Sequence, residues 1–457
     1  MVKNSRGVML KELWILGAPT IVEQLLQTMV GYVDTAMVGR LGAKASAAVG
    51  VTATVNWLFY GMMFAASLGL LSYIARFTGA GDEKSARRAS AQGIWLLLFL
   101  GIPESILALA ISPALPNWLG AAEEIREDAS MYFFLVSLAM FFRCSMIVFG
   151  NVLRANKDTR TPMKVNILVN LLNIVLNQLL IGGTVVLKAG SLRIPVPGMG
   201  LGIGGAAIAT ALSLALGGIL LFAAAMQSPK STLRGQPIRP DQKILRSVFS
   251  VSLPLMGERL IIGSGYVMFT TIVASLGTVA TAAHTIALQV EEAFYIPGYG
   301  VQTAVSTLAG NALGERSLSK LSQVVKAGLS FAVSIMALMA AGLFWKADWI
   351  MAIFTRDSQV VSLGASVLRI VAVSEPLFAA FIILEGTFHG IGETKLPVMI
   401  GRFTMWGIRI GLSWCLVHWL HVGLQTVWVC MIMDNITRCL LLAALYRWGK
   451  WKNKLFL

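Results

Sequence analysis

Hydrophobic residues are arranged along this chain in long runs, and short polar segments separate one run from the next. Each run is at least about as long as the roughly 20 apolar residues that a helix needs to cross a bilayer. The pattern predicts an all-α polytopic membrane protein with twelve transmembrane helices. These cover residues 13–38, 46–76, 91–114, 131–153, 163–186, 200–226, 249–275, 284–312, 325–346, 364–388, 398–419 and 425–446.

The composition agrees with this pattern, because 56% of the residues are hydrophobic and 13% are charged. Soluble chains carry about a quarter charged residues. The chain has no G-x-x-x-x-G-K-[ST] sequence for ATP hydrolysis, no defensible Ser-His-Asp or Cys-His arrangement, and no metal-like cysteine spacing. We therefore expect neither an enzyme nor a resident metal or cofactor.

The net charge of +15 is typical of a nucleic-acid-binding protein, but the positions of the charges favour a membrane orientation instead. Most lysines and arginines fall in alternate connecting segments, on the side that would hold both termini. The opposite segments hold only Arg40, Lys44, Arg126, Lys188, Arg193, Lys346 and Arg356. The positive-inside rule predicts a cell-membrane protein with both termini in the cytoplasm and no nucleic-acid partner.

The two halves of the sequence resemble each other at a fixed offset of 235 residues. Matched positions include Pro19 with Pro254, Glu23 with Glu258, Gly42 with Gly277, Gly79 with Gly314, and Thr159 with Thr394. Six spans per half make the repeats parallel, and transporters of this design bind substrate at the midplane and alternate access. We expect an N-lobe at 1–227, a cytoplasmic linker at 228–243 and a C-lobe at 244–457, around a central cleft. A major-facilitator protein has the same layout.

Charged residues inside membrane spans are candidates for function, because burying each one in the bilayer is costly. Asp34 lies in the first span, three helical turns after Glu23 and on the same face, about 16 Å away along the axis. Only Glu23 has an acidic repeat partner, since Asp34 matches Phe269. An apolar environment disfavours an ionised carboxylate, so Asp34 could exchange a proton for a cationic substrate. The alternative is an aspartate paired with an arginine for stability.

Other polar residues of the spans are candidates as well. Asn166, Asn170, Asn173 and Asn177 line one helical stripe, where they could bind a cation or join helices through amide hydrogen bonds. Asp434 and Arg438 could pair along the last helix. Candidates for the substrate cleft are Glu23, Glu258, Glu291, Glu292, Glu375 and Arg259, and candidate hinges or static kinks are Pro19, Pro254 and Pro297.

Taken together, the chain resembles the multidrug and toxic compound extrusion (MATE) family over nearly its whole length. The specific segments are Gly31 to Gly42 around Asp34, Gly79 to Asp82, Leu153 to Thr159, Gly202 to Thr210, and Gly386 to Thr394. The resemblance implies twelve helices in two lobes and export of cationic or amphipathic compounds in exchange for protons or sodium. It also implies that Asp34 is the N-lobe carboxylate for the coupling ion, with Asn173, Asn177 and Thr210 around it.

Two departures from the family pattern bear on the coupling ion. Sodium-type relatives carry an aspartate where this chain has Asn177, and losing an anionic oxygen ligand weakens sodium binding. Phe378 stands where one branch has a C-lobe acid, so that branch's cation site cannot be carried over intact. The position of Pro19 before Asp34 resembles the sequence of the branch in which the first helix bends on protonation. The resemblance therefore favours protons over sodium.

We expect a proton-coupled antiporter in which substrate binds while Asp34 is ionised and protonation of Asp34 expels it. A two-lobe transporter needs one chain, so its expected partners are a small-molecule substrate, the coupling cation and the bilayer. The main rival is a flippase or exporter of a lipid-linked or otherwise anionic substrate in the same superfamily. Its motivation is the set of arginines inside the apolar runs, namely Arg143, Arg259, Arg369, Arg402, Arg409 and Arg438.

Overall fold

The computed structural model describes residues 2–189, 192–228, 239–449 and 451–452. Most of the predicted linker, at 229–238, lies outside the described residues. The first half contains the helices α1 (Val2–Gly39), α2 (Ala43–Gly79), α3 (Glu83–Leu96), η1 (Leu97–Gly101), α4 (Ile102–Ile111), α5 (Leu115–Trp118), α6 (Glu123–Ser137), α7 (Met140–Ala155), α8 (Arg160–Leu180) and α9 (Gly202–Gln227). The labels η1 and η2 denote π-helical segments.

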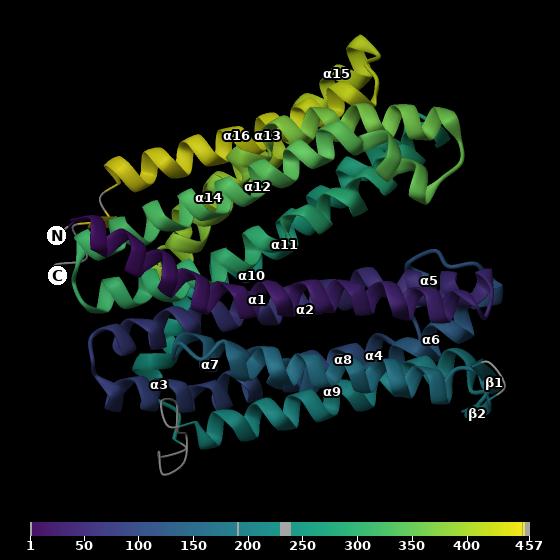
Figure 1. The fold of residues 1–457 in the computed structure, drawn as a ribbon, viewed down its shortest axis with the longest axis horizontal. Helices are drawn as coiled ribbons and strands as arrows, with labels where there is room; N and C mark the ends of the chain where they lie inside the picture. The colour runs from purple at the N-terminus through teal and green to yellow at the C-terminus, as the bar shows by residue number, and fades with distance from the viewer. Residues whose placement is uncertain (1, 190–191, 229–238, 450, 453–457) are drawn as a thin grey trace. The chain divides into compact units, whose positions relative to one another are not determined.

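The second half consists of helices throughout its described part (Figure 1). They are α10 (Gln242–Ala274), α11 (Thr278–Gly314), α12 (Leu318–Phe354), α13 (Ser358–Ile391), α14 (Lys395–Phe403), η2 (Thr404–Leu412), α15 (Ser413–Leu420) and α16 (Leu424–Trp448). Every predicted span therefore corresponds to a helix or to a run of adjoining helices.

Seven of the described helical segments are long and apolar enough to cross a membrane. An eighth is counted when α6 and α7, which meet at a bend of 47°, form one broken span. The remaining four predicted spans are helical too, and correspond to α1, α10, α11 and the continuous run from α14 through η2 to α15.

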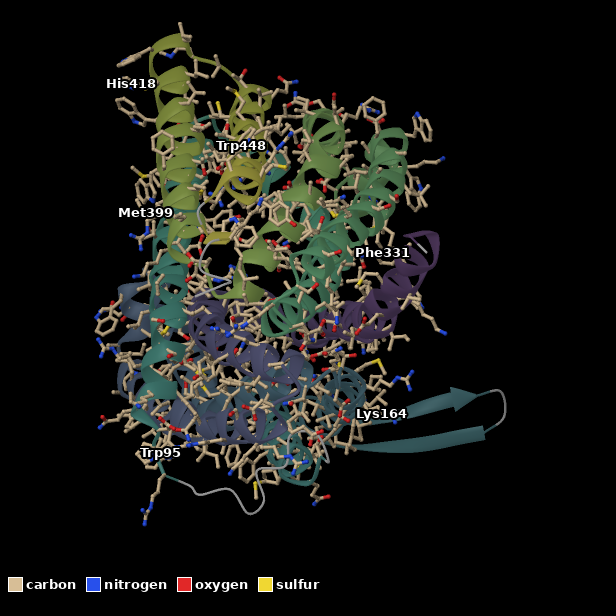
Figure 2. All side chains as sticks on the ribbon, turned by 90° about the vertical axis from the view of Figure 1, so that its left-hand side faces the viewer. Trp95, Lys164, Phe331, Met399, His418 and Trp448 are labelled. Carbon is tan, nitrogen blue, oxygen red and sulfur yellow. The ribbon has the colours of Figure 1, made fainter. Side chains whose placement is uncertain are left out.

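Several predicted helix ends are wrong: α1 begins at Val2 rather than at residue 13, and α12 ends at Phe354 rather than at residue 346. The fifth span was expected to continue to residue 186, but α8 ends at Leu180 and the chain enters a hairpin of β1 (Gly183–Ala189) and β2 (Leu192–Met199). The hairpin projects to one side of the helices (Figure 2). Gly182 and Gly183 lower the helix propensity at this point, and a run of β-branched residues follows.

The helices form two compact units. The first unit comprises the residues up to Ile21, Ala75–Asp82 and the residues from Phe249 onward. In it, Trp14 of α1 lies edge-on to Phe331 of α12, with ring centroids 5.7 Å apart. The second unit comprises Val22–Ile74 and Glu83–Val248. Three helices, α1, α2 and α10, therefore contribute one end to each unit.

The backbone repeats at the offset that the sequence predicts. Three pairs of helix-ending positions share a positive φ: Gly42 (111°) with Gly277 (104°), Gly81 (71°) with Arg316 (52°), and Lys157 (64°) with Gly392 (77°). After α2 and α11 the same closing hydrogen bond forms, from Asp82 N to Phe77 O at 3.1 Å and from Ser317 N to Ala312 O at 3.0 Å. The two halves therefore end corresponding helices in the same way.

Candidate functional site

The four predicted coupling residues lie together in the second unit, where α1, α8 and α9 meet. Asn177 donates a hydrogen bond of 2.5 Å from Nδ2 to Oδ1 of Asp34, and a second of 3.1 Å to Oδ1 of Asn173. Asn173 in turn donates to the Thr210 hydroxyl at 3.4 Å. With its amide turned over, Asn173 reaches both Asp34 carboxylate oxygens, at 2.8 and 3.3 Å. The α8 amides therefore bind the Asp34 carboxylate of α1, and Thr210 of α9 bonds to one of these amides, Asn173.

The groups that touch Asp34 are neutral amides, so they stabilise its ionised form without cancelling its charge. Asn173 and Asn177 are buried, whereas Asp34 is partly accessible. Oδ1 of Asn177 is buried and has no hydrogen-bond partner among the described residues. Together the four side chains carry one negative charge when Asp34 is ionised, which a single proton or monovalent cation would balance.

Glu23 lies in a separate, charge-balanced cluster. Its Oε1 accepts hydrogen bonds from Arg154 Nη2 at 2.5 Å and from Asn166 Nδ2 at 2.8 Å, and the side chain is buried. Arg154 also donates to Asn151 Oδ1 at 3.0 Å. The structure thus places Glu23 in a buried ion pair, and it brings two of the four predicted stripe asparagines to Asp34 and one to Glu23.

The sequence reasoning did not select Glu104 of α4 or Tyr132 of α6. The Glu104 carboxylate lies within electrostatic reach of the Arg143 guanidinium. Tyr132 is hydrogen-bonded to Thr210 and lies within electrostatic reach of both Asp34 and Arg143. Glu104 stands inside the predicted span 91–114, so the rule that singled out Asp34 would have found it as well.

The helix that carries Glu104 is not the regular helix that its hydrophobic pattern predicts. Residues Leu97–Gly101 form the π-helical segment η1, and Pro103 follows in the first turn of α4. Such insertions change which side chains face the interior and are frequent at functional sites. A Cβ on Gly101 would lie 3.2 Å from Cβ of Cys144, so the glycine lets this segment approach α7 closely.

The first unit holds a second group of charges, on α10, α13, α14 and α16. Glu258, Glu385 and Arg438 line a small cavity whose other walls are Phe381, Pro397, Ile400, Gly401 and Leu442. Glu385 accepts a hydrogen bond of 2.8 Å from Gln302. Arg438 and Arg259 both lie within electrostatic reach of Glu258, which is buried.

Asp434 lies at the centre of an ion-pair network. Its Oδ1 is 2.7 Å from Arg438 Nε, which confirms the predicted pair along the last helix, and its Oδ2 is 2.8 Å from Arg409 Nε. Arg409 lies in the π-helical segment η2 and also donates to Asn435 at 3.0 Å. One buried carboxylate therefore holds two arginines, an arrangement that the sequence spacing predicted for one of them alone.

The remaining acidic candidates differ in their surroundings. Glu291 is buried and accepts a hydrogen bond from the Tyr295 hydroxyl, whereas the adjacent Glu292 is exposed, so the two do not share a face. Glu375 is 1% exposed, and neither carboxylate oxygen has a hydrogen-bond partner among the described residues. Glu375 and Glu291 lie within electrostatic reach of each other.

The candidate hinges Pro19, Pro254 and Pro297 lie inside α1, α10 and α11, each of which continues past its proline. Each proline removes one backbone N–H from the helical hydrogen-bond ladder. Pro19 stands next to the point at which α1 passes from one compact unit to the other, after Ile21. The hinge role of the three prolines stays a prediction.

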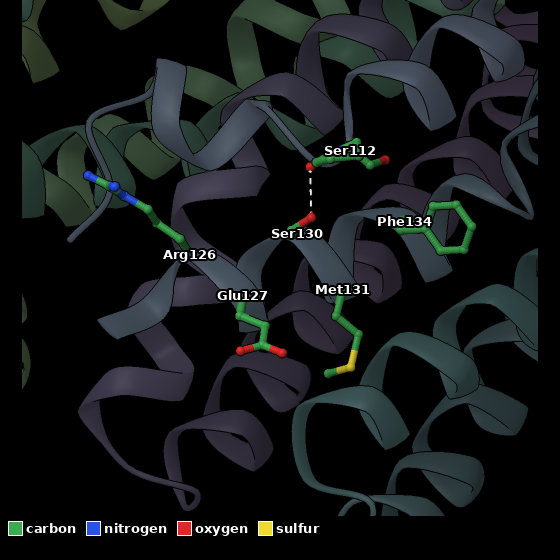
Figure 3. Close-up of a pocket in the computed structure, with 7 residues that line it drawn as sticks. Ser112, Arg126, Glu127, Ser130, Met131 and Phe134 are labelled. Carbon is green, nitrogen blue, oxygen red and sulfur yellow. Dashed lines mark hydrogen bonds between the residues drawn. The ribbon is translucent and has the colours of Figure 1, made fainter. Parts of the chain in front are cut away.

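A surface hollow lies between the end of α4 and the helix α6 (Figure 3). It is lined by Ser112, Pro113, Arg126, Glu127, Ser130, Met131 and Phe134. Within it the Ser130 hydroxyl donates to the Ser112 carbonyl at 3.0 Å. None of the predicted site residues lines this hollow. In the described part of the chain, no group of three or more His, Cys, Asp or Glu side chains could hold a metal ion.

Comparison with known sequences gives relatives of the same length. The chain is 29% identical over 445 residues to a probable multidrug resistance protein NorM of Thermotoga maritima, covering 97% of this chain and 93% of the relative. It is 22% identical to the uncharacterized transporter YisQ of Bacillus subtilis, covering 97% and 94%. The alignments therefore extend over both halves.

Solved structures show the same fold. An outward-facing MATE transporter of the MOP superfamily matches with a TM-score of 0.88 at 24% identity, covering 98% of this chain and 96% of that one. The Vibrio cholerae MATE transporter VcmN, solved as a mutant, matches with a TM-score of 0.87 at 19% identity, covering 99% of each. These matches confirm the predicted all-α class of twelve membrane helices in two repeats.

The MatE family profile matches residues 19–179 and 254–415, which is one match in each half of the chain. The two matched segments begin at Pro19 and Pro254, the positions that the internal offset pairs. The matches cover most of the spans and include Asp34, Asn173 and Asn177. The chain therefore belongs to the multidrug and toxic compound extrusion family and is a multi-pass membrane transporter rather than an enzyme.

Proposed function

We propose that this protein is a secondary antiporter that exports cationic or amphipathic compounds in exchange for protons, with Asp34 as the group that both ligands require. The observation that carries the proposal is the hydrogen bond of 2.5 Å from the neutral Asn177 amide to the Asp34 carboxylate. The partly accessible carboxylate keeps its negative charge for a proton or a cationic substrate. We place the protein in the cell membrane, with both termini in the cytoplasm, and expect one chain to suffice.

Coupling follows if proton and substrate compete for this group. An ionised Asp34 attracts a cation and accepts the Asn177 hydrogen bond, whereas a protonated Asp34 does neither with the same strength. Two ligands that need different states of one group expel each other, which is the thermodynamic requirement for exchange. The substrate leaves where protons are plentiful and binds where they are scarce.

Sodium is the less favoured coupling ion. A cation of this kind is held by several oxygen ligands, preferably including carboxylates. Asp34 is the one carboxylate among the four converging side chains, and Asn177 directs an N–H group rather than an oxygen towards it. Oδ1 of Asn177 has no hydrogen-bond partner among the described residues, and turning the amide would present that oxygen to a cation, so sodium remains the alternative.

Drug export is the favoured activity because several relatives are named as probable multidrug resistance proteins. The rival activity, transport of an anionic or lipid-linked compound, calls for arginines with free charge. Instead, Arg369 pairs with Asp348 and Arg409 with Asp434. Arg143 and Arg259 each lie within electrostatic reach of a glutamate as well.

The test is efflux of a fluorescent lipophilic cation such as ethidium from proteoliposomes, under a proton gradient and then under a sodium gradient. We expect transport on the proton gradient alone, with loss of that transport in Asp34→Asn. The control is Glu83→Gln, which alters an exposed carboxylate that pairs with Arg87 outside the spans. Transport driven by sodium alone would overturn the proton assignment, and no transport under either gradient would favour the anionic rival.

A further inference from the structure

The cytoplasm-facing ends of α2 and α11 cross at two glycines, where the two backbones are in direct contact because no side chain separates them. Gly79 of α2 lies against the backbone of Asn311, and Gly314 of α11 lies against the backbone of Arg76. A methyl group built on either glycine would overlap the facing carbonyl oxygen. Because the overlap is with backbone, no side-chain rearrangement relieves it, and only separation of the helices would.

This crossing is symmetric with respect to the internal repeat. Gly79 and Gly314 are partners at the offset of 235 residues, and so are Arg76 and Asn311. Gly79 of the first half contacts Asn311 of the second half, and Gly314 of the second half contacts Arg76 of the first. The two contacts are therefore equivalent under the repeat. Two equivalent helix ends, one from each half of the chain, meet here as a matched pair.

In the repeat pair of Arg76 and Asn311, burial of Asn311 costs free energy. Asn311 is fully buried, and neither its Nδ2 nor its Oδ1 has a hydrogen-bond partner among the described residues. Its repeat partner Arg76 is exposed. A buried amide without partners loses its hydrogen bonds to water and gains none in return. Opening the crossing would rehydrate the Asn311 amide, so the cost of burying this amide opposes the close approach of the two helices.

We propose that the Gly79–Asn311 and Gly314–Arg76 crossing is the closed cytoplasmic gate of the transport cycle, held in balance by two opposed features. The glycines permit closure, and the unsatisfied Asn311 amide favours opening. The positive-inside pattern assigns this end of α2 and α11 to the cytoplasm, since Arg76 and Arg316 stand at it. The gate rests on the proposed alternating-access function, but it concerns which side is open, not which ion drives transport.

Opposite substitutions should therefore move the gate in opposite directions. Gly314→Ala and Gly79→Ala should hold it open, because the added methyl groups cannot be accommodated when the helices meet. Asn311→Leu should hold it closed, because a side chain of similar shape without polar atoms removes the cost of burial. Gly50→Ala is the matched control, since Gly50 lies on α2 with nothing within 4 Å of the added Cβ.

The readout is the rate at which a hydrophilic maleimide labels Thr307→Cys, one helical turn before Asn311 on the same face. The protein is purified with its four native cysteines replaced, and Thr307 itself is 1% exposed. We expect Gly314→Ala and Gly79→Ala to raise the labelling rate about fivefold or more and Asn311→Leu to lower it by a similar factor.

This measurement depends on neither substrate nor ion, so it separates failure of the gate from failure of the antiport proposal. Glycine variants that label at the rate of Gly50→Ala would overturn the gate, and so would faster labelling in Asn311→Leu. If a glycine variant does not fold, as judged by size-exclusion chromatography, the Asn311→Leu result decides alone. Loss of ethidium efflux with the expected labelling changes leaves the gate supported and removes the drug-export proposal.

Discussion

Asn177 bonds to Asp34 in the same way that Asn166 bonds to Glu23, eleven residues earlier on the same two helices. The two hydrogen bonds measure 2.5 and 2.8 Å. Eleven residues are close to three helical turns, so α1 and α8 run parallel and in register over this distance. One acid is balanced by Arg154 and the other is left with neutral partners, which makes Asp34 the group available to a transported cation.

Replacing Asn177 by aspartate should convert the site towards sodium. The substitution adds a second carboxylate beside Asp34, and hard monovalent and divalent cations prefer anionic oxygen ligands. We expect Asn177→Asp to show ethidium efflux on a sodium gradient and a melting temperature that rises with sodium concentration, because a ligand that binds the native state stabilises it.

Asn170→Asp is the control for this change. Asn170 lies on the same helix and stripe, but no hydrogen bond joins it to Asp34, and its own Nδ2 is buried without a partner among the described residues. A new carboxylate there should leave the sodium response unchanged. If both variants respond to sodium equally, added negative charge rather than ligand geometry is responsible, and the assignment of Asn177 to the site is wrong.

The buried ion pair of Glu23 and Arg154 should act as a unit, because each charge compensates the other. Removing one partner of a buried ion pair leaves an uncompensated charge and typically costs about 3 to 5 kcal/mol. We expect both Glu23→Gln and Arg154→Gln to lower the melting temperature of the purified protein substantially. The double variant should lose much less than the sum of the two, since it contains no unpaired charge. Additive losses would show that the pair is not coupled.

The resemblance to the family implied that Asp34, Asn173, Asn177 and Thr210 form one site, and the structure brings them together. The eleven-residue spacing of Glu23 and Asp34 also predicted that both lie on one face of α1, and α8 packs against that face. The internal offset located Gly42 and Gly277, whose positive φ angles of 111° and 104° both permit a helix to begin directly afterwards. The shared helix face and the matched glycines were accessible because they depend on spacing along one helix or on comparison of two halves. The grouping of residues from three helices rested instead on the resemblance to the family.

Other features depend on which helices meet, which spacing does not report. Arg154 is far from Glu23 in the sequence, and no periodicity indicates that it pairs with that acid rather than with water. Likewise the π-helical segments η1 and η2 insert a residue without changing hydrophobicity, so both were predicted as regular helix. The hairpin after α8 was missed because its β-branched residues continue the apolar run of the span.

The buried carboxyl group of Glu375 should lower the stability of the protein, and replacing it tests whether the group is needed for transport. Its carboxyl group is buried without a hydrogen-bond partner among the described residues, and a buried unsatisfied polar group costs about 1 to 3 kcal/mol. We expect Glu375→Met to raise the melting temperature, because methionine fills a similar volume without polar atoms. If the acid serves transport, ethidium efflux falls in the same variant. A lower melting temperature would instead mean that the carboxyl group has a stabilising partner.

Glycines at the positive-φ helix ends should resist substitution far more than a glycine inside a helix. Gly277 adopts φ 104° and ψ 175°, a region that is open essentially to glycine alone, so Gly277→Ala should destabilise the protein by about 1 to 3 kcal/mol. Gly50→Ala, inside α2 with no neighbour within 4 Å, should stabilise it by about 0.5 to 1 kcal/mol instead. Melting temperatures of the two variants in one detergent compare them directly. Equal shifts of the melting temperature would contradict the backbone argument. Shifts of opposite sign would show that the positive φ, rather than lack of space for a methyl group, is the reason that both halves have glycine at Gly42 and Gly277.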